Sequence, residues 1–142
     1  MVRQLAAAAL GLMILNATAF AQEKDSAKET PMTGRIYELR TYYCVPGRLP
    51  KLHQRFKEHT LALFEKHGMK NEMYWTPLGA DHANKLIYIV SHDSEEAAKK
   101  SWAGFRADPV WIKARDASEA DGKIVEKVES VMMKEADFFG KK

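Results

Sequence analysis

The sequence is short of several features that would assign a function at once. Its 142 residues include one cysteine, which excludes an internal disulfide framework and any zinc or iron–sulfur site built from cysteines. Lys and Arg number 22 against 19 Asp and Glu, too slight an excess to favour nucleic acid. The five histidines lack metal-site spacing, and there is no glycine-rich phosphate loop. We therefore expect no nucleic acid, metal or cofactor, but one small globular core.

The first residues have the composition of an export signal. Arg3 is the only charged residue before the apolar run Leu5–Leu15, and Ala19-Phe20-Ala21 then supplies small residues at positions −3 and −1 of a cleavage site. This combination predicts a secretory signal peptide over residues 1–21, cleaved after Ala21. The alternative, a membrane anchor, is disfavoured because the run is far short of the roughly 20 residues that span a bilayer. We predict a secreted or periplasmic protein with no membrane span after cleavage.

The rest of the chain reads as a polar leader followed by one domain. Residues 22–33 lack aromatic side chains and predict a flexible leader, so the folded domain is expected over 34–139. From Leu49 apolar residues follow a helical period as far as Gly68, a residue that commonly ends helices. Ser94 is a good N-cap for a second helix, which breaks near Asp108-Pro109 and restarts. Strands are expected over residues 35–44, 70–78, 85–91 and 124–133.

The order of these elements, β-α-β-β-α-β, predicts an α+β domain of ferredoxin-like type. Right-handed crossovers place the strands of its four-stranded antiparallel sheet in the order 4-1-3-2, with helices on one face. Lys85–Ser91 is apolar or aromatic at nearly every position, which is typical of a strand buried on both faces. Because an uncovered apolar face favours association with a second copy, we expect a homodimer that closes into an α/β barrel.

Four short motifs carry a resemblance to a known family. YELRTYY at 37–43, PGRL at 46–49, HTLALFEKHG at 59–68 and ADPVW at 107–111 together resemble the NIPSNAP family. The resemblance covers almost the whole domain and implies the dimeric α/β-barrel variant of the ferredoxin-like fold. It implies no catalytic residues, because the family is defined by its domain. The export signal differs from the mitochondrial and vesicle-trafficking setting of the animal members, so those roles are not transferred; an exported member looks bacterial.

Four polar residues are candidates for chemistry. Glu38, Arg40 and Tyr42 alternate along the first strand, so they share one face of a central strand, where charges are normally paired or excluded. They predict either a ligand-facing acid with an anion-binding guanidinium or a structural ion pair. His59 falls on the predicted apolar face of the first helix, as a general base or as a hydrogen-bonded core histidine. The sharpest prediction is that Glu38, Arg40 and His59 meet in one pocket, provided that Glu38 rather than Leu39 faces the helices.

Two classes of function stay open at this point. Tyr42, Trp75 and Tyr88 are candidates for lining the pocket of a small-ligand-binding protein, or alternatively pack in the core and the dimer interface. The first class includes enzymes like the cofactor-independent monooxygenases and isomerases that share this barrel; the second is a non-catalytic structural or interaction homodimer. Unpaired charges in a deep pocket would favour the first class, and paired charges in a filled interior the second. Cys44 is expected as a buried thiol rather than an interchain disulfide.

Overall fold

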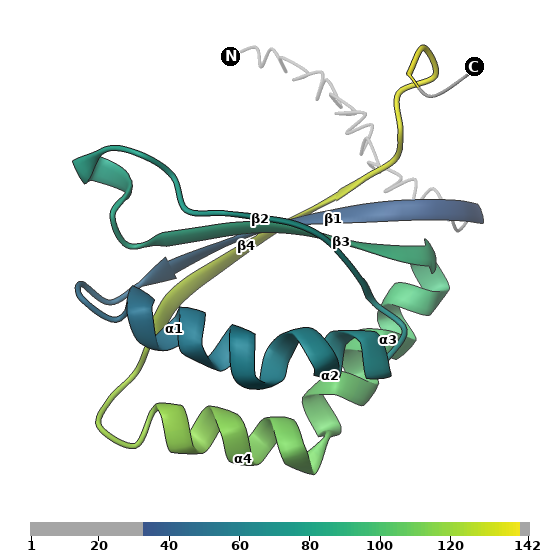
Figure 1. Ribbon diagram of the computed structural model, residues 1–142. Coiled ribbons are helices and arrows are strands. Elements are labelled where there is room, and N and C mark those ends of the chain that lie inside the picture. Colours follow the sequence, from purple (N-terminus) through teal and green to yellow (C-terminus); the bar gives the residue numbers. More distant parts are fainter. Residues whose placement is uncertain (1–32, 140–142) are drawn as a thin grey trace, which may run out of the picture.

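The computed structural model describes residues 33–139. The predicted signal peptide over 1–21, and all but the last residue of the predicted leader over 22–33, lie outside this range. Among the described residues, no helix is long and apolar enough to cross a membrane. The elements (Figure 1) are β1 (Thr33–Cys44), α1 (Leu49–Arg55), the π-helical turn η1 (Phe56–Thr60), α2 (Leu61–Lys66), β2 (Lys70–Trp75), the 3-10 turn η2 (Ala80–His82), β3 (Lys85–Ser94), α3 (Glu95–Ala107), α4 (Pro109–Ser118) and β4 (Val125–Met133).

The strands form one antiparallel sheet in the order β2-β3-β1-β4. This confirms the predicted 4-1-3-2 order and the α+β class. β2 ends at Trp75 rather than at residue 78, because Pro77 has no N–H to donate to a strand ladder. β3 runs three residues further than predicted: Ser94 still pairs with Thr33, while its side chain accepts a hydrogen bond from the N–H of Ala97 and caps α3.

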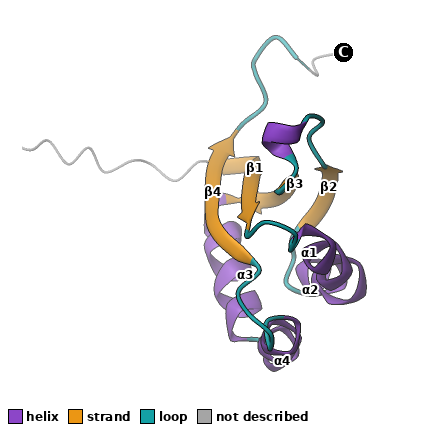
Figure 2. Cartoon of the chain, turned by 90° about the vertical axis from the view of Figure 1, so that its left-hand side faces the viewer, coloured by secondary structure: helices purple, strands orange, loops and turns teal. Residues whose placement is uncertain are grey.

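The helices cover one face of the sheet (Figures 1 and 2), and the core lies between these two layers. Leu86, Tyr88 and Val90 alternate along β3, point toward the helices and are at most 4% exposed. Phe56 and Phe64 meet them from the helical side, with ring centroids 5.3 and 6.0 Å from that of Tyr88. Aromatic rings at this spacing contribute about 0.5–1.5 kcal/mol per pair beyond their buried area, so an aromatic layer holds the sheet to the helices.

One π-helical turn interrupts the first helix, which the sequence predicted to be regular. In η1 the N–H of Leu61 donates to the carbonyl of Phe56. A π turn holds an additional residue compared with an α turn, so the buried face of the helix advances by one position. Thr60 is therefore buried, at 1% exposure, where a regular helix would have placed His59.

Asp108 separates α3 from α4 and confirms the predicted break. Its Oδ1 accepts a hydrogen bond from the N–H of Val110 at 2.8 Å, and Pro109 occupies the first helical position, where no N–H is needed. Its Oδ2 accepts from Lys66 Nζ at 2.7 Å and lies 2.8 Å from His67 Nε2. The hydrogen bonds from Lys66, His67 and Val110 hold the pKa of Asp108 well below its ordinary value. One carboxylate thus caps α4 and ties it to the end of α2.

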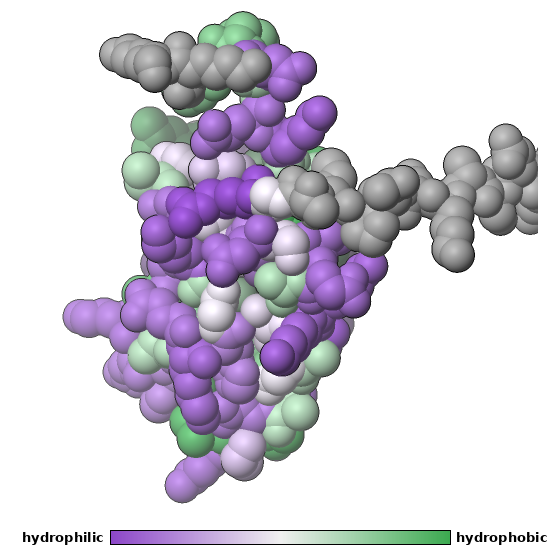
Figure 3. Space-filling model, turned by 90° about the vertical axis from the view of Figure 1, so that its right-hand side faces the viewer, coloured by the Kyte–Doolittle hydropathy of each residue, from purple (hydrophilic) through white to green (hydrophobic). Residues whose placement is uncertain are grey.

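The face of the sheet opposite the helices has no cover from the described part of the chain. Met73, Trp75 and Val131 on this face are 53%, 44% and 53% exposed. Ile87 and Ile89 lie beside Trp75 and Met73 in the register and are half-buried. By contrast, hydrophilic side chains dominate the end of the molecule seen in Figure 3. These five residues define what we call the open sheet face, an apolar surface that spans β2, β3 and β4.

Candidate functional site

The structure decides which face of β1 carries the predicted polar residues. Ile36 and Cys44 lie an even number of residues from Glu38 and Arg40 along β1, and so on the same face of the strand. They are 1% and 4% exposed and lie in the core. Glu38 and Arg40 therefore face the helices, as the pocket prediction requires, and Leu39 faces the other way. Cys44 is buried, as expected, and burial raises the pKa of its thiol.

Glu38 is the centre of a buried polar cluster. Its Oε1 accepts hydrogen bonds from Arg40 Nη1 and from Ser130 Oγ, both at 2.6 Å. Its Oε2 accepts from Trp102 Nε1 at 2.5 Å and lies 3.2 Å from His92 Nε2. These partners come from β1, β3, α3 and β4, so one side chain joins both layers of the fold. We call these five residues the Glu38 cluster.

Two opposing effects set the charge of Glu38. Burial by itself raises the pKa of its carboxyl, whereas the hydrogen bonds from His92, Ser130, Trp102 and Arg40 lower it, with a net result of about 2. Glu38 is consequently an ionised acceptor at neutral pH and is badly matched to proton transfer there, for which a pKa near the working pH is best. Its chemistry is to hold donors in place.

Arg40 and Ser130 are the members of the cluster that reach toward solvent. The guanidinium carbon of Arg40 lies 4.3 Å from the ring centroid of Trp102 and 5.6 Å from that of Tyr42, and its side chain is 17% exposed. No described residue accepts a hydrogen bond from its Nε. The hydroxyl of Tyr88 donates to that of Tyr42 at 3.1 Å, and burial raises the pKa of Tyr88 well above its ordinary value. Arg40 and Tyr42 thus border a fully buried aromatic core.

Beside Arg40 the helical layer leaves part of β4 uncovered. Val128, Ser130 and Met132 pair with Tyr42, Arg40 and Glu38 of β1 respectively, and residues paired in this way lie on the same face of a sheet. Val128 and Met132 are nevertheless 41% and 43% exposed. These three β4 residues, which we call the β4 shelf, place apolar surface next to a guanidinium.

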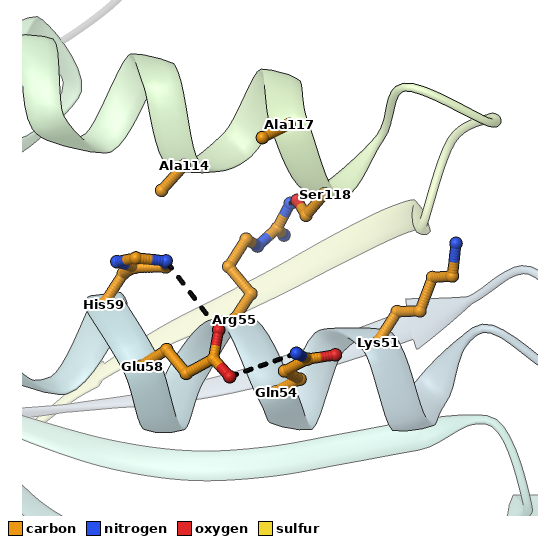
Figure 4. A pocket seen from close by; sticks show the side chains of 8 residues that line it. All are labelled: Lys51, Gln54, Arg55, Glu58, His59, Ala114, Ala117 and Ser118. Carbon is orange, nitrogen blue, oxygen red and sulfur yellow. Dashed lines mark hydrogen bonds and ion pairs between the residues drawn. The ribbon is translucent and has the colours of Figure 1, made fainter.

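The prediction that His59 joins Glu38 and Arg40 is wrong. The side chain of His59 is 43% exposed, and its Nε2 lies 3.9 Å from Glu58 Oε2. It lines a cavity of about 290 Å³ between the first helix and α4 (Figure 4), on the opposite side of the helix from the sheet. The cause is η1, whose additional residue turns Thr60 toward the core and His59 away from it.

The three aromatic residues predicted to line one pocket also lie in two different places. Tyr42 and Tyr88 contact each other in the core, with ring centroids 5.4 Å apart. Trp75 lies on the open sheet face and borders a different cavity of about 300 Å³, lined also by Tyr74 and Leu86. No single pocket among the described residues therefore brings together all the residues singled out from the sequence.

Sequence reasoning missed three members of the Glu38 cluster. His92 shares the parity of Tyr88 on β3, and this alternation was a usable signal for its position on the inner face. Trp102 is a large aromatic residue of the kind that commonly packs in a core, but no pattern in the sequence indicates that its ring N–H meets a carboxylate. Ser130 lies directly opposite Arg40, which only the register reveals. Within the described range, no three His, Cys, Asp or Glu side chains are grouped as metal ligands.

Comparison with solved structures shows the same fold in several bacterial proteins. A NIPSNAP family protein of unknown function from Agrobacterium tumefaciens has 22% identity and a TM-score of 0.64, over 75% of this chain and 93% of that one. An uncharacterised NIPSNAP-like domain protein from Burkholderia xenovorans has 17% identity and a TM-score of 0.64, over 75% and 90% of the two chains. SnoaB, a cofactor-independent oxygenase from Streptomyces nogalater, has 13% identity and a TM-score of 0.51, over 77% and 100%.

Sequence comparison assigns the family. No curated protein sequence matches the chain. The model of the family described as NIPSNAP matches residues 37–139, which is nearly the whole described range and lies inside the domain expected over 34–139. The match includes all four motifs noted in the sequence and β1 to β4 except for the first residues of β1. The chain belongs to the NIPSNAP family.

Proposed function

We propose that this protein binds a small ligand on the helix-side face of β4, where Arg40 holds a carboxylate or carbonyl oxygen and the β4 shelf receives apolar atoms. One observation carries the proposal: Arg40 is partly exposed beside half-exposed Val128 and Met132, and its Nε has no acceptor among the described residues. A guanidinium has five N–H donors in a planar fork, which suits it to the oxygens of a ligand.

Glu38 acts in this proposal as the residue that positions Arg40. Because one carboxylate oxygen takes a hydrogen bond from Arg40 and Trp102 stacks on the guanidinium, the side chain is held in one orientation before any ligand arrives. A preorganised donor loses little conformational entropy on binding. The low pKa of Glu38 argues against a reaction that uses it as an acid or base, so a ligand-binding role is favoured over an oxygenase-like or isomerase-like reaction.

A second candidate is a non-catalytic homodimer in which the charges only hold the domain together. It is favoured by the pairing of Glu38, since both of its oxygens have donors. Both candidates share the proposal that a second copy of the chain covers the open sheet face. Exposed Met73, Trp75 and Val131 support this, because apolar surface spread over three strands is costly to leave in water.

Mass spectrometry under non-denaturing conditions separates the two candidates. We expect the exported protein to carry a co-purified small molecule, to lose it in Arg40→Met and to keep it in Arg115→Met, a control on the exposed surface of α4. A wild type free of added mass, combined with an Arg40→Met variant that unfolds at much lower temperature, would support the structural homodimer instead.

Export is proposed from the sequence alone, since residues 1–21 lie outside the described part of the chain. N-terminal sequencing of the protein recovered from the periplasm or the medium of a bacterial host should begin at Gln22. A chain that keeps Met1 would contradict the cleavage.

A further inference from the structure

The helical layer contains a groove that the Glu38 cluster does not use. It lies between the first helix and α4, on the side away from the sheet (Figure 4). Two adjoining cavities of about 290 and 520 Å³ share His59, Ala114 and Ala117 in their walls. The larger one has the size of a pocket for a small organic molecule. We call this space the helical groove.

The two walls of the groove differ in chemistry. On the first helix, Lys51, Arg55 and His59 recur at four-residue spacing, which places them on one face, and all three point toward α4 in Figure 4. On α4, the facing residues Ala114 and Ala117 are too small to fill the space between the helices. One wall therefore supplies nitrogen donors and the other supplies methyl groups.

Arg55 is the group that points to a ligand. Its side chain is only 4% exposed, and its guanidinium carbon lies 5.1 Å from the ring centroid of Trp111. Nη1 donates to Ser118 Oγ at 3.1 Å and to Glu119 Oε1 at 3.3 Å, and the second distance is long for a charged pair. Its Nε is buried with no acceptor among the described residues. A buried guanidinium without a full set of acceptors is poised to take an oxyanion.

The remaining charges around the groove leave room for one more anion. Lys51 is paired with Asp121, which lies outside the lining, and Glu58 accepts from Gln54 Nε2 at 3.0 Å. Lys113 lines the larger cavity. Counting the lining side chains, Lys51, Arg55 and Lys113 stand against Glu58 as the one carboxylate. Glu119 and Asp121 pair with Arg55 and Lys51 from outside the lining, so the excess of cations belongs to the lining itself, and its cationic end is the one that holds Lys51 and Arg55.

The larger cavity continues this cationic end with apolar atoms. Pro109 and Val110 extend the wall begun by Ala114 and Ala117, and Val110 is 50% exposed. A ligand with a negatively charged head and a short hydrocarbon tail matches a groove that is cationic at one end and apolar at the other. We propose that the helical groove binds a monocarboxylate with an apolar chain, its carboxylate at Arg55 and its chain along Ala117 and Val110.

Calorimetric titration with octanoate tests the proposal, with octan-1-ol as the uncharged probe and acetate as the probe without a chain. Octanoate should bind saturably and at least about tenfold tighter than either control probe, which is what one charge-assisted hydrogen bond supplies. Equal binding of octan-1-ol, or no saturation by octanoate, would overturn the proposal.

Two substitutions locate the site. Ala117→Leu fills the groove from an exposed helical position and should weaken octanoate binding at least about tenfold, a loss equal to that of one good contact. Ala103→Leu, the same change on the exposed side of α3, should leave binding unaltered. Arg55→Met should weaken binding as well, and Lys51→Gln replaces it if the buried change prevents folding.

A third variant keeps this proposal apart from the one at the β4 shelf. Arg40→Met removes the guanidinium of the β4 shelf, so the octanoate binding that this variant retains belongs to the helical groove, and we expect it to retain saturable binding that Ala117→Leu weakens. If octanoate binding is lost in Arg40→Met and kept in Ala117→Leu, the carboxylate lies at the β4 shelf and the groove proposal fails.

Discussion

The buried pair of Glu38 and Arg40 depends on having enough partners. A charge inside a sheet is costly unless hydrogen bonds replace its lost water. Glu38 is 2% exposed and receives donors from four different residues. Those donors lower its pKa to about 2 in spite of burial. The ionised carboxylate is consequently part of what stabilises the folded state.

Glu38→Gln should lower the free energy of unfolding at neutral pH. It should also make that free energy less sensitive to acid. Because the pKa of Glu38 is lower in the folded chain than the ordinary 4.5, its charge stabilises the fold above that pH. This contribution, on the order of 2 kcal/mol, is lost as the pH falls toward about 2. Urea unfolding at pH 7, 5 and 3 measures this, and the free energy of unfolding should fall more steeply with decreasing pH in the wild type than in Glu38→Gln.

The matched control for this prediction is Glu126→Gln on exposed β4, which should keep the wild-type pH profile. An unchanged acid dependence in Glu38→Gln would mean that other carboxylates set it.

At the scale of the elements, the π turn and the Asp108 junction shape the helical layer. η1 accommodates one residue more than an α turn, and both helical segments that flank it still bury their apolar sides, with Leu52 before it and Phe64 after it fully buried. Asp108 closes the other half of the layer by capping α4 and binding Lys66 and His67. Each of these two features leads to a prediction of how one deletion or substitution changes the stability.

Deletion of Lys57, an exposed residue of η1, should convert the π turn into a regular α turn and leave the flanking helices on their present faces. We expect a folded chain with a melting temperature within about 5 °C of the wild type, since little buried surface changes. Deletion of Ala103 inside α3 is the comparison: it rotates everything after it, including Phe105, out of register. Circular dichroism melts that rank the two deletions in the opposite order would contradict this account of η1.

Asp108→Ala removes the N-cap of α4 and the shared partner of Lys66 and His67. Loss of a cap of this kind should lower the melting temperature by about 4–8 °C in a domain of this size. Asp116→Ala on the exposed side of α4 should change it by far less, because its contact with Arg115 lies in solvent. Differential scanning calorimetry of the two variants measures the difference, and equal melting temperatures would refute the capping role.

At the scale of the whole molecule, the described part of the chain, residues 33–139, covers the sheet on one face only (Figure 2). The uncovered face carries Met73, Trp75 and Val131 at 53%, 44% and 53% exposure. A second copy that packs there would bury these side chains under another layer of structure, as the helices bury the inner face. The proposed homodimer therefore follows from strands that carry apolar side chains on both faces of the sheet.

Val131→Lys should convert the proposed dimer into a monomer by placing a charge within the open sheet face. Val110→Lys is the matched control, because Val110 has a similar exposure of 50% but lies on α4. Sedimentation velocity at micromolar concentration should show dimers for the wild type and Val110→Lys. A monomeric wild type, or a Val131→Lys variant that dimerises equally well, would rule out this interface.

The sequence by itself determined the order of the elements and of the strands. Alternation and helical periodicity are local properties, and the handedness rule for crossovers converts their order into a topology. The same alternation placed Glu38, Arg40 and Tyr42 on one face of β1, and local cap chemistry located the break at Asp108-Pro109. The motifs at 37–43, 46–49, 59–68 and 107–111 were sufficient to indicate the family.

Only the tertiary structure decided which face of β1 meets the helices and what surrounds Glu38. Both parities of β1 carry apolar or aromatic residues, so the choice depends on packing of the helices rather than on β1. The partners Trp102 and Ser130 lie 64 and 92 residues away along the chain, and no local pattern encodes such a contact. The π turn likewise left no mark in the apolar spacing, yet its additional residue moved His59 from the expected pocket to the helical groove.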